Sequence, residues 1–163
     1  MDHWYPAYVG LGSNLDGPSG QVESAIGHLQ GIRETRLTAR SGLYRSTPFG
    51  GVEQPDFVNA AAALLTRLGP GDLLTELQEI ERNRGREQDT ERWGPRLIDL
   101  DLLVYSDRVA EEPGLTVPHP GIAERNFVLL PLKEIAPSLV IPGLGRLETL
   151  PVNMDEPQIE KIS

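Results

Sequence analysis

Cysteine is absent from the 163-residue chain, which excludes both a disulfide framework and a thiolate metal site. No apolar run is long enough to cross a bilayer, since the longest covers only Ala60 to Leu65. The first residues, 1–4, do not form a basic segment followed by an apolar one, so we expect no secretion signal. These absences predict a soluble, cytoplasmic protein without a membrane partner.

Positive charge is also scarce. The chain has 15 Lys and Arg residues against 24 Asp and Glu, which gives a formal net charge of −9 at pH 7. This balance argues against a general nucleic-acid binder, which needs a basic face. Lysine occurs only at positions 133 and 161, and five of the 15 basic residues are arginines within 82–96. Arginine suits planar, bidentate contact with phosphate. The window predicts either a phosphate-binding segment or a solvated loop of mixed charge, since acidic residues are interspersed.

Hydrophobic periodicity predicts an α+β domain that covers residues 1–163, with a peripheral tail after about 150. The expected elements are a strand from 7 to about 13, a helix through 22–29, strands over 36–46 and 57–66, a helix from 70 to about 84, and a strand over 97–105. A further helix is expected to begin near Pro120. Residues 47–56 and 83–95 lack periodicity and predict long loops. This order favours a ferredoxin-like sandwich, with helices packed on one face of a mainly antiparallel sheet.

Two aspartates, Asp99 and Asp101, interrupt the last of these strands. Side chains two positions apart in a strand share a face, with Cα atoms roughly 6–7 Å apart. The neighbours are largely apolar, so we expect much of the strand to be covered. The two carboxylates would repel each other by roughly 2–3 kcal/mol at an effective dielectric near 20, and burial would add a desolvation cost. A positive partner is therefore expected.

The sequence offers two such partners. Arg92 or Arg96 could form ion pairs with the aspartates, or a hard divalent cation such as Mg²⁺ could bind them together with phosphate oxygens. Other phosphate motifs are excluded, because the Gly-x-Gly at 10–12 is followed by Leu15 in place of a third glycine and no P-loop exists. The arginine-rich window just before the aspartates favours the metal.

Five blocks of sequence, taken in order, resemble the hydroxymethyldihydropterin pyrophosphokinase family of folate biosynthesis. The blocks are YVGLGSN, LYRSTPFGGVEQPDFVNAA, ELQEIERNRGR, RWGPRLIDLDLLVY and LTVPHPGIAERNFVLLPLKEIAP. They span nearly the whole chain before Leu150, and the RWGPR-x-x-D-x-D block is the most specific. The resemblance implies a ferredoxin-like fold. It also implies transfer of the terminal pyrophosphoryl group of ATP to the hydroxymethyl group of a reduced pterin, with release of AMP.

The resemblance also implies which residues act on the phosphates. Asp99 and Asp101 would bind two Mg²⁺ ions that bridge ATP and the pterin hydroxyl, and Arg86 and Arg96 would clamp the phosphates as charge shifts. No strong general base is visible, and the metal could serve by acidifying the hydroxyl.

Substrate contacts follow from the same resemblance. The pterin-binding residues would be Ser46, Thr47, Phe49, Phe57, Asn59, Trp93 and Phe127. Phe57 and Phe127 would sandwich the ring, and Asn59 would pair with one of its edges. Without the resemblance, these two phenylalanines would be assigned to the core. The ATP-binding residues would be Gln78, Glu81, Arg86, Arg96, His119 and Arg125.

The sequence departs from the family pattern at four positions. Gln88 and Asp89 replace residues that are often basic, Gly114 stands where some relatives have arginine, and Pro120 where some have an aromatic residue. These changes bear on the ATP contacts and not on the reaction.

Three functional hypotheses follow: a monomeric enzyme acting on ATP and a reduced pterin, a non-catalytic relative that binds nucleotide or pterin, and a sheet-based RNA binder. Both aspartates and both arginines are retained, which favours the enzyme over the binding module. The acidic charge disfavours RNA.

Overall fold

The computed structural model describes residues 3–48, 53–83 and 97–163. Its centre is an antiparallel sheet in the order β10-β3-β4-β1-β5, with β2 also paired to β4. These strands are β1 (Tyr5–Ser13), β2 (Thr35–Arg40), β3 (Tyr44–Ser46), β4 (Phe57–Thr66), β5 (Asp99–Tyr105) and β10 (Ile159–Lys161). The predicted α+β fold with a mainly antiparallel sheet is confirmed.

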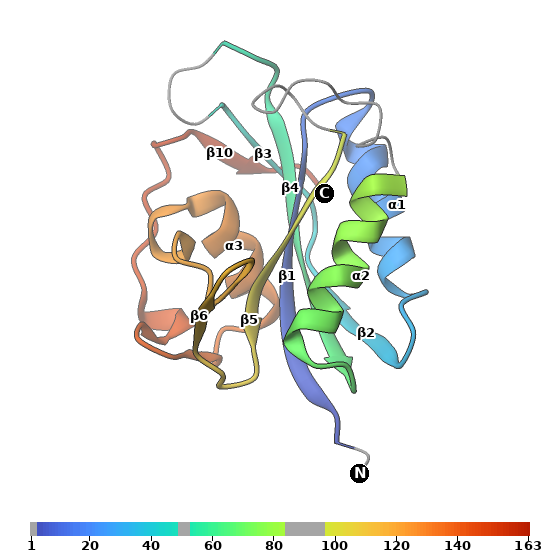
Figure 1. The fold of residues 1–163 in the computed structure, drawn as a ribbon. Helices are drawn as coiled ribbons and strands as arrows, with labels where there is room; N and C mark the ends of the chain where they lie inside the picture. Colours follow the sequence, from blue (N-terminus) through green and yellow to red (C-terminus); the bar gives the residue numbers. More distant parts are fainter. Residues whose placement is uncertain (1–2, 49–52, 84–96) are drawn as a thin grey trace.

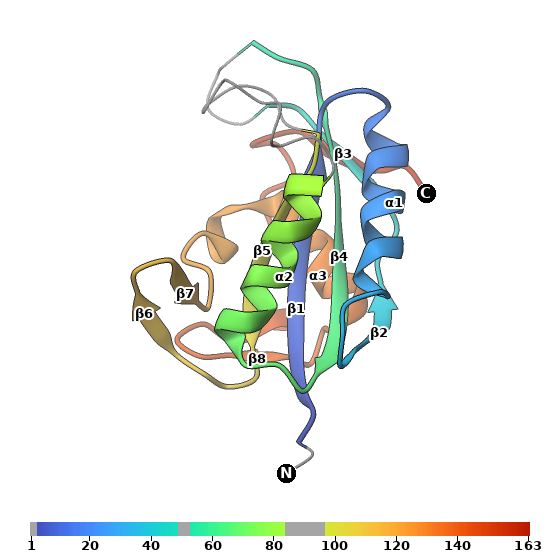
Figure 2. The same cartoon turned by 45° about the vertical axis from the view of Figure 1, so that its right-hand side comes forward.

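Helices cover both faces of this sheet (Figure 1). α1 (Pro18–Leu29) and α2 (Pro70–Asn83) lie side by side on one face, and α3 (Asn126–Ile135) lies on the other (Figures 1 and 2). The sequence analysis placed the helices on one face only, and α3 corrects that expectation. Within the described residues no helix is long and apolar enough to cross a membrane.

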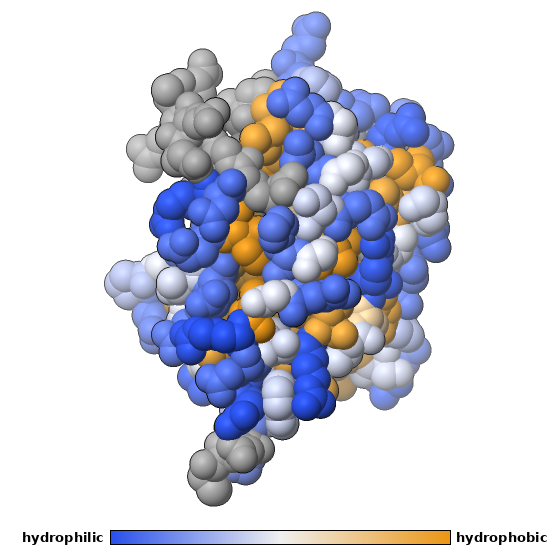
Figure 3. All heavy atoms as spheres, turned by 90° about the vertical axis from the view of Figure 1, so that its right-hand side faces the viewer, coloured by the Kyte–Doolittle hydropathy of each residue, from blue (hydrophilic) through white to orange (hydrophobic). Residues whose placement is uncertain are grey.

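Each face of the sheet has its own hydrophobic core. Toward α1 and α2, β4 contributes Val58, Ala60, Ala62 and Leu64, which alternate along the strand as a period of two requires. Toward α3, Ala61 packs with Leu103, Leu129 and other buried residues of the second core. The alanines of β4 therefore form a strand that is buried on both sides. The outer surface of the α1–α2 layer is mainly polar, with small separated apolar areas (Figure 3).

Short elements complete the chain. They are β6 (Ala110–Glu112), β7 (Leu115–Val117), β8 (Val140–Ile141), β9 (Gly145–Arg146) and the 3-10 turns η2 (Ile122–Glu124) and η3 (Leu147–Thr149). The helix expected near Pro120 begins only at Asn126, because the 3-10 turn η2 precedes it. The single strand expected over 36–46 is divided into β2 and β3. Ser41 lies at the break, where its Oγ accepts a hydrogen bond from the Ala61 N–H.

The chain after residue 150 returns to the central sheet. Its last strand, β10, pairs with β3 in an antiparallel register, and Ile159 is buried there. The sequence analysis did not foresee this strand, since a tail of three paired residues gives too short a pattern to detect.

Glu134 links α3 to β3 and β10. Its carboxylate accepts hydrogen bonds from the Tyr44 hydroxyl (2.8 Å) and the Gly42 N–H, and Lys161 lies 3.5 Å away. Partial burial acts to raise the pKa of the Glu134 carboxyl, but these donors and the lysine outweigh it and hold the pKa below the ordinary value of 4.5. The unfolded chain therefore binds this proton more readily than the folded protein does.

Acidification should remove the stabilisation that the ionised Glu134 carboxylate provides through these hydrogen bonds and Lys161. Because the folded pKa is depressed, the stabilisation is present above pH 4.5 and is lost as the pH falls through the folded value. We expect the free energy of unfolding to fall more steeply with acid in the wild type than in Glu134→Gln. Urea denaturation at a series of pH values measures this difference, and parallel pH profiles of the two proteins would contradict it.

Candidate active site

A cavity of about 230 Å³ opens on the α3 side of the sheet, at the end where β1 stops and β5 starts. Three strands and the start of α3 line it. The lining residues are Gly10, Leu11, Gly12, Gln54, Phe57, Asn59, Ala60, Asp99, Asp101, Arg125, Phe127 and Val128. Six of the residues predicted from the sequence therefore meet in one place: Phe57, Asn59, Asp99, Asp101, Arg125 and Phe127.

Sheet register explains how they meet. Gly12 of β1 lies opposite Asn59 of β4 on one side and opposite Asp99 of β5 on the other. Gly10 lies opposite Asp101 in the same way. Asparagine, glycine and aspartate thus form one row across three adjacent strands.

The glycines of β1 form the floor of the cavity. A Cβ added at Gly12 would lie 3.2 Å from Asn59 Oδ1, closer than most real Cβ contacts. Bare backbone at 10 and 12 therefore leaves room between the amide and the carboxylates. The sequence analysis used these glycines only to reject a dinucleotide fingerprint. A strand that carries glycine at alternate positions was the signal for a close ligand approach.

The aspartates are less covered than the sequence predicted. Asp101 is exposed and Asp99 is half-buried, whereas Leu100 and Leu102 on the opposite face are buried. The reason is that the aspartates face the cavity, while α3 packs against the strand further along, at Leu103. Their desolvation cost is accordingly smaller than expected. Within the described ranges, no three His, Asp or Glu side chains gather as a ready-made metal cluster.

Phe57 and Phe127 are cavity residues. Both line the opening and are half-buried, and neither belongs to a core cluster, so the alternative that assigned them to the core is wrong. They come from different elements, β4 and α3. Asn59, which lines the same cavity, is almost fully buried, and its Nδ2 donates to Ser46 Oγ at 2.9 Å. That bond fixes which way the amide points.

Arg125 lines the cavity, whereas His119 does not, although its imidazole is close enough to Asp101 and Arg125 to be affected by their charges. Burial lowers the pKa of His119, the Asp101 carboxylate acts to raise it, and the Arg125 guanidinium lowers it again. The net shift favours neutral imidazole. Because the Gly121 N–H donates to Nδ1 at 3.0 Å, the proton of the neutral ring resides on Nε2. His119 can therefore donate one hydrogen bond toward a ligand.

Glu81 and Gln78 lie on α2, away from the lining of the cavity. Glu81 is buried, and its Oε2 accepts a hydrogen bond from the Leu100 N–H at 2.8 Å, which holds the strand segment between the two aspartates. Gln78 is exposed. Their predicted role in framing ATP stays a prediction.

The remaining predicted site residues divide into two groups. Ser46 and Thr47 end β3 and begin the next loop, beside the cavity residue Asn59. Phe49, Arg86, Trp93 and Arg96 lie outside the described residues, as do Gln88, Asp89 and Arg92.

Two residues of the site were missed. Gln54 lines the cavity, and Asn14 donates from Nδ2 to Gln54 Oε1 (2.9 Å) and to the Pro55 carbonyl (3.3 Å). Asn14 thus joins the end of β1 to the loop before β4. The partners of Asn14 are 40 and 41 residues away along the chain, so no local pattern in the sequence indicated them.

The sequence matches the family described as 7,8-dihydro-6-hydroxymethylpterin-pyrophosphokinase over residues 8–137. The chain belongs to this family. Among curated members it is 49% identical to the 2-amino-4-hydroxy-6-hydroxymethyldihydropteridine pyrophosphokinase of Pseudomonas aeruginosa, over 88% of each chain. It is 42% identical to the protein of that name from Methylorubrum extorquens, over 96% of this chain and 98% of the relative.

Solved structures share the family's fold. The wild-type Plasmodium falciparum HPPK-DHPS crystallised with pterin and p-hydroxybenzoate matches with a TM-score of 0.71 at 15% identity. The match covers 92% of this chain but only 43% of the Plasmodium chain. At this identity the likeness supports the fold alone, and the pyrophosphokinase family assignment comes from the sequence matches.

Proposed function

We propose that this cavity is the active site of a pyrophosphokinase. The protein transfers pyrophosphate from ATP to the hydroxymethyl group of 6-hydroxymethyl-7,8-dihydropterin, a step of folate biosynthesis, and releases AMP. The observation that supports the site is the row of Asn59, Gly12 and Asp99 across three strands, with a phenylalanine on each of two elements beside it. An amide, two rings and two carboxylates suit a flat heterocycle that carries a reactive hydroxyl.

The pterin would lie between Phe57 and Phe127. Ring stacking adds about 0.5–1.5 kcal/mol beyond the burial of area. Asn59 would pair with one edge of the ring, since a side-chain amide both donates and accepts. Ser46 Oγ holds the Asn59 amide in that orientation by accepting a hydrogen bond from Asn59 Nδ2. Trp93 and Phe49 complete the proposed pterin contacts on the strength of the resemblance.

Asp99 and Asp101 would hold Mg²⁺, and we propose two ions. The two carboxylates share one face of β5, open to the cavity, and leave the other coordination positions to water and phosphate oxygens, as magnesium prefers. Bound magnesium supplies charge neutralisation on the triphosphate and lowers the pKa of a coordinated hydroxyl.

The residues of the chain would position the reaction. The pterin hydroxyl oxygen attacks the β-phosphorus of ATP, the bond from that phosphorus to the oxygen of the α-phosphate breaks, AMP leaves, and the hydroxyl proton passes to solvent. Arg125 and the Nε2–H of His119 would bind phosphate oxygens, together with Arg86 and Arg96. Such fixed donors stabilise charge where it develops. Residues 1–163 would form one domain, and a monomeric, cytoplasmic enzyme stays the prediction from sequence.

Product analysis tests the function. The protein is incubated with ATP, the reduced pterin and Mg²⁺, and nucleotides are separated by ion-exchange chromatography. We expect AMP and the pterin diphosphate in equal amounts, and neither product when EDTA removes the metal. ADP as the product, or turnover that EDTA leaves unchanged, would contradict the proposal.

A further inference from the structure

The C-terminal segment, residues 153–163, contacts two elements that carry proposed pterin residues, although it lies beyond the residues matched by the family and does not line the cavity. It reaches β3 on one side and the start of α3 on the other.

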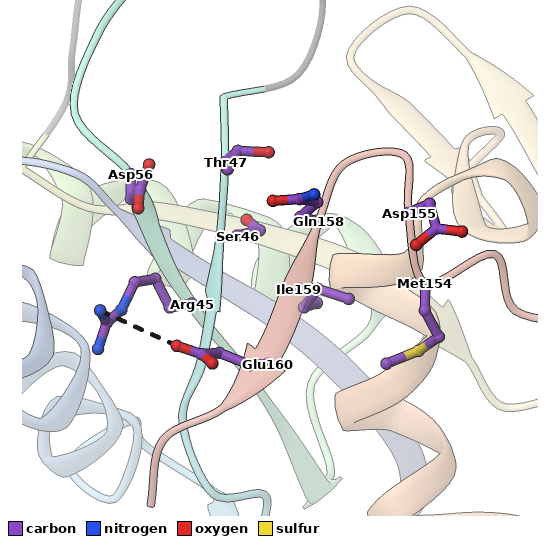
Figure 4. Close-up of a pocket in the computed structure, with 9 residues that line it drawn as sticks. All are labelled: Arg45, Ser46, Thr47, Asp56, Met154, Asp155, Gln158, Ile159 and Glu160. Atoms are coloured by element: carbon purple, nitrogen blue, oxygen red, sulfur yellow. Dashed lines mark ion pairs between the residues drawn. The ribbon is translucent and has the colours of Figure 1, made fainter.

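On the first side, β10 fixes β3. Ile159 pairs with Ser46, the Thr47 N–H donates to the Gln158 carbonyl (3.1 Å), and the Ile162 N–H donates to the Leu43 carbonyl (2.8 Å). Figure 4 shows Gln158, Ile159 and Glu160 beside the β3 residues, with Glu160 directed toward Arg45. β3 has only three residues and is paired along both edges, with β10 and with β4.

β3 in turn fixes the pterin amide. Ser46 lies between Ile159 on β10 and Phe57 on β4, and its Oγ accepts the hydrogen bond from Asn59 Nδ2. A shift of β3 would therefore move the acceptor that orients Asn59. The C-terminal strand acts on the polar edge of the proposed pterin site through this one serine.

On the second side, Asn126 fixes the start of α3. Its side chain is 3% exposed, and its Nδ2 donates to the carbonyls of Asn153 (2.6 Å) and Pro157 (2.7 Å). The next residue along the helix is Phe127. The segment that pairs with β3 at Ser46 therefore also binds Asn126, the residue adjacent to Phe127.

We propose that residues 153–163 are a positioning element for the pterin pocket, with Asn126 as the positioning residue on α3. The inference rests on the proposed function. A flat ring between two phenylalanines from different elements needs those elements at a fixed separation before it binds, and preorganisation of this kind contributes directly to affinity. The aspartates lie on β5, on the far side of β1 from β3, so loss of β10 should affect pterin binding and spare ATP binding.

The test is calorimetric titration of Asn126→Ala with the reduced pterin, at saturating Mg²⁺ and a non-hydrolysable ATP analogue. Loss of the two hydrogen bonds is expected to raise the pterin Kd by about tenfold, in the range of one to two net hydrogen bonds. A second variant that ends at Pro157 removes β10 and should also weaken pterin binding, while its Kd for the ATP analogue should change by less than about twofold, because Arg125 and the aspartates lie outside β3 and β10.

Lys133→Met is the matched control. Lys133 is also on α3, and its Nζ donates to the Leu150 carbonyl, so it too joins the helix to the C-terminal part of the chain, but it does not line the cavity. We expect Lys133→Met to lower the melting temperature and leave the pterin Kd unchanged. Equal pterin affinity in Asn126→Ala and Lys133→Met would overturn the inference. Failure of the wild type to bind pterin would instead overturn the proposed function.

Discussion

Asparagine in place of Asp101 is expected to lower the rate of AMP formation by about a hundredfold to a thousandfold, the usual loss when one group that stabilises transition-state charge is removed. The amide has the shape of the carboxylate but no charge, so the affinity for Mg²⁺ falls with it. The fold should survive, because Asp101 is exposed and its removal relieves repulsion from Asp99. Steady-state kinetics across a magnesium titration, with thermal unfolding alongside, measures both effects.

Asp107→Asn is the control for this experiment. Asp107 is an exposed aspartate in the turn just after β5 and does not line the cavity. The substitution makes the same change in net charge close to the same strand, so activity should stay at the wild-type level. If Asp101→Asn kept wild-type activity at all magnesium concentrations, the proposed metal site would be wrong.

Phe127→Ala should weaken pterin binding by roughly tenfold to a hundredfold, the range found when an aromatic residue that stacks on a flat base is truncated. Affinity for the ATP analogue should fall far less, because the ring is proposed to contact the pterin and not the nucleotide. Phe127 is only half-buried and lies outside both core clusters, so the loss of stability should be small. Calorimetric titration with each ligand separately gives the two affinities.

Phe127→Leu separates stacking from burial. Leucine restores most of the apolar volume but has no ring, so its pterin affinity should lie between those of alanine and phenylalanine. If Phe127→Ala bound pterin as tightly as the wild type, Phe127 would not be part of the pterin site.

The sequence predicted the central fold because its patterns are local. Val22, Ile26 and Leu29 recur at helical spacing, and all three are buried on α1. The strand predicted over 57–66 is strand β4, with the same bounds. These features need only a window of neighbouring residues.

Features that depend on distant contacts were not predictable in this way. The strand β10 forms by pairing with the free edge of β3, which is distant in the sequence. The second face of the sheet is covered by α3, which packs against β4 and β5. The apolar neighbours of Asp101 predicted the strand but not its exposure, because exposure depends on which part of the strand α3 covers. The family resemblance indicated the site residues, but only the structure shows that six of them line one cavity and that Asn59 and Asp99 lie on either side of Gly12.

The bare backbone in the floor of the cavity has a practical consequence for antifolate discovery. A competitive inhibitor that rests on Gly12 would be hard to escape by mutation at that position, because any added side chain would press on Asn59, the proposed partner of the pterin edge. A variant that excluded the drug from this surface would exclude the proposed substrate as well.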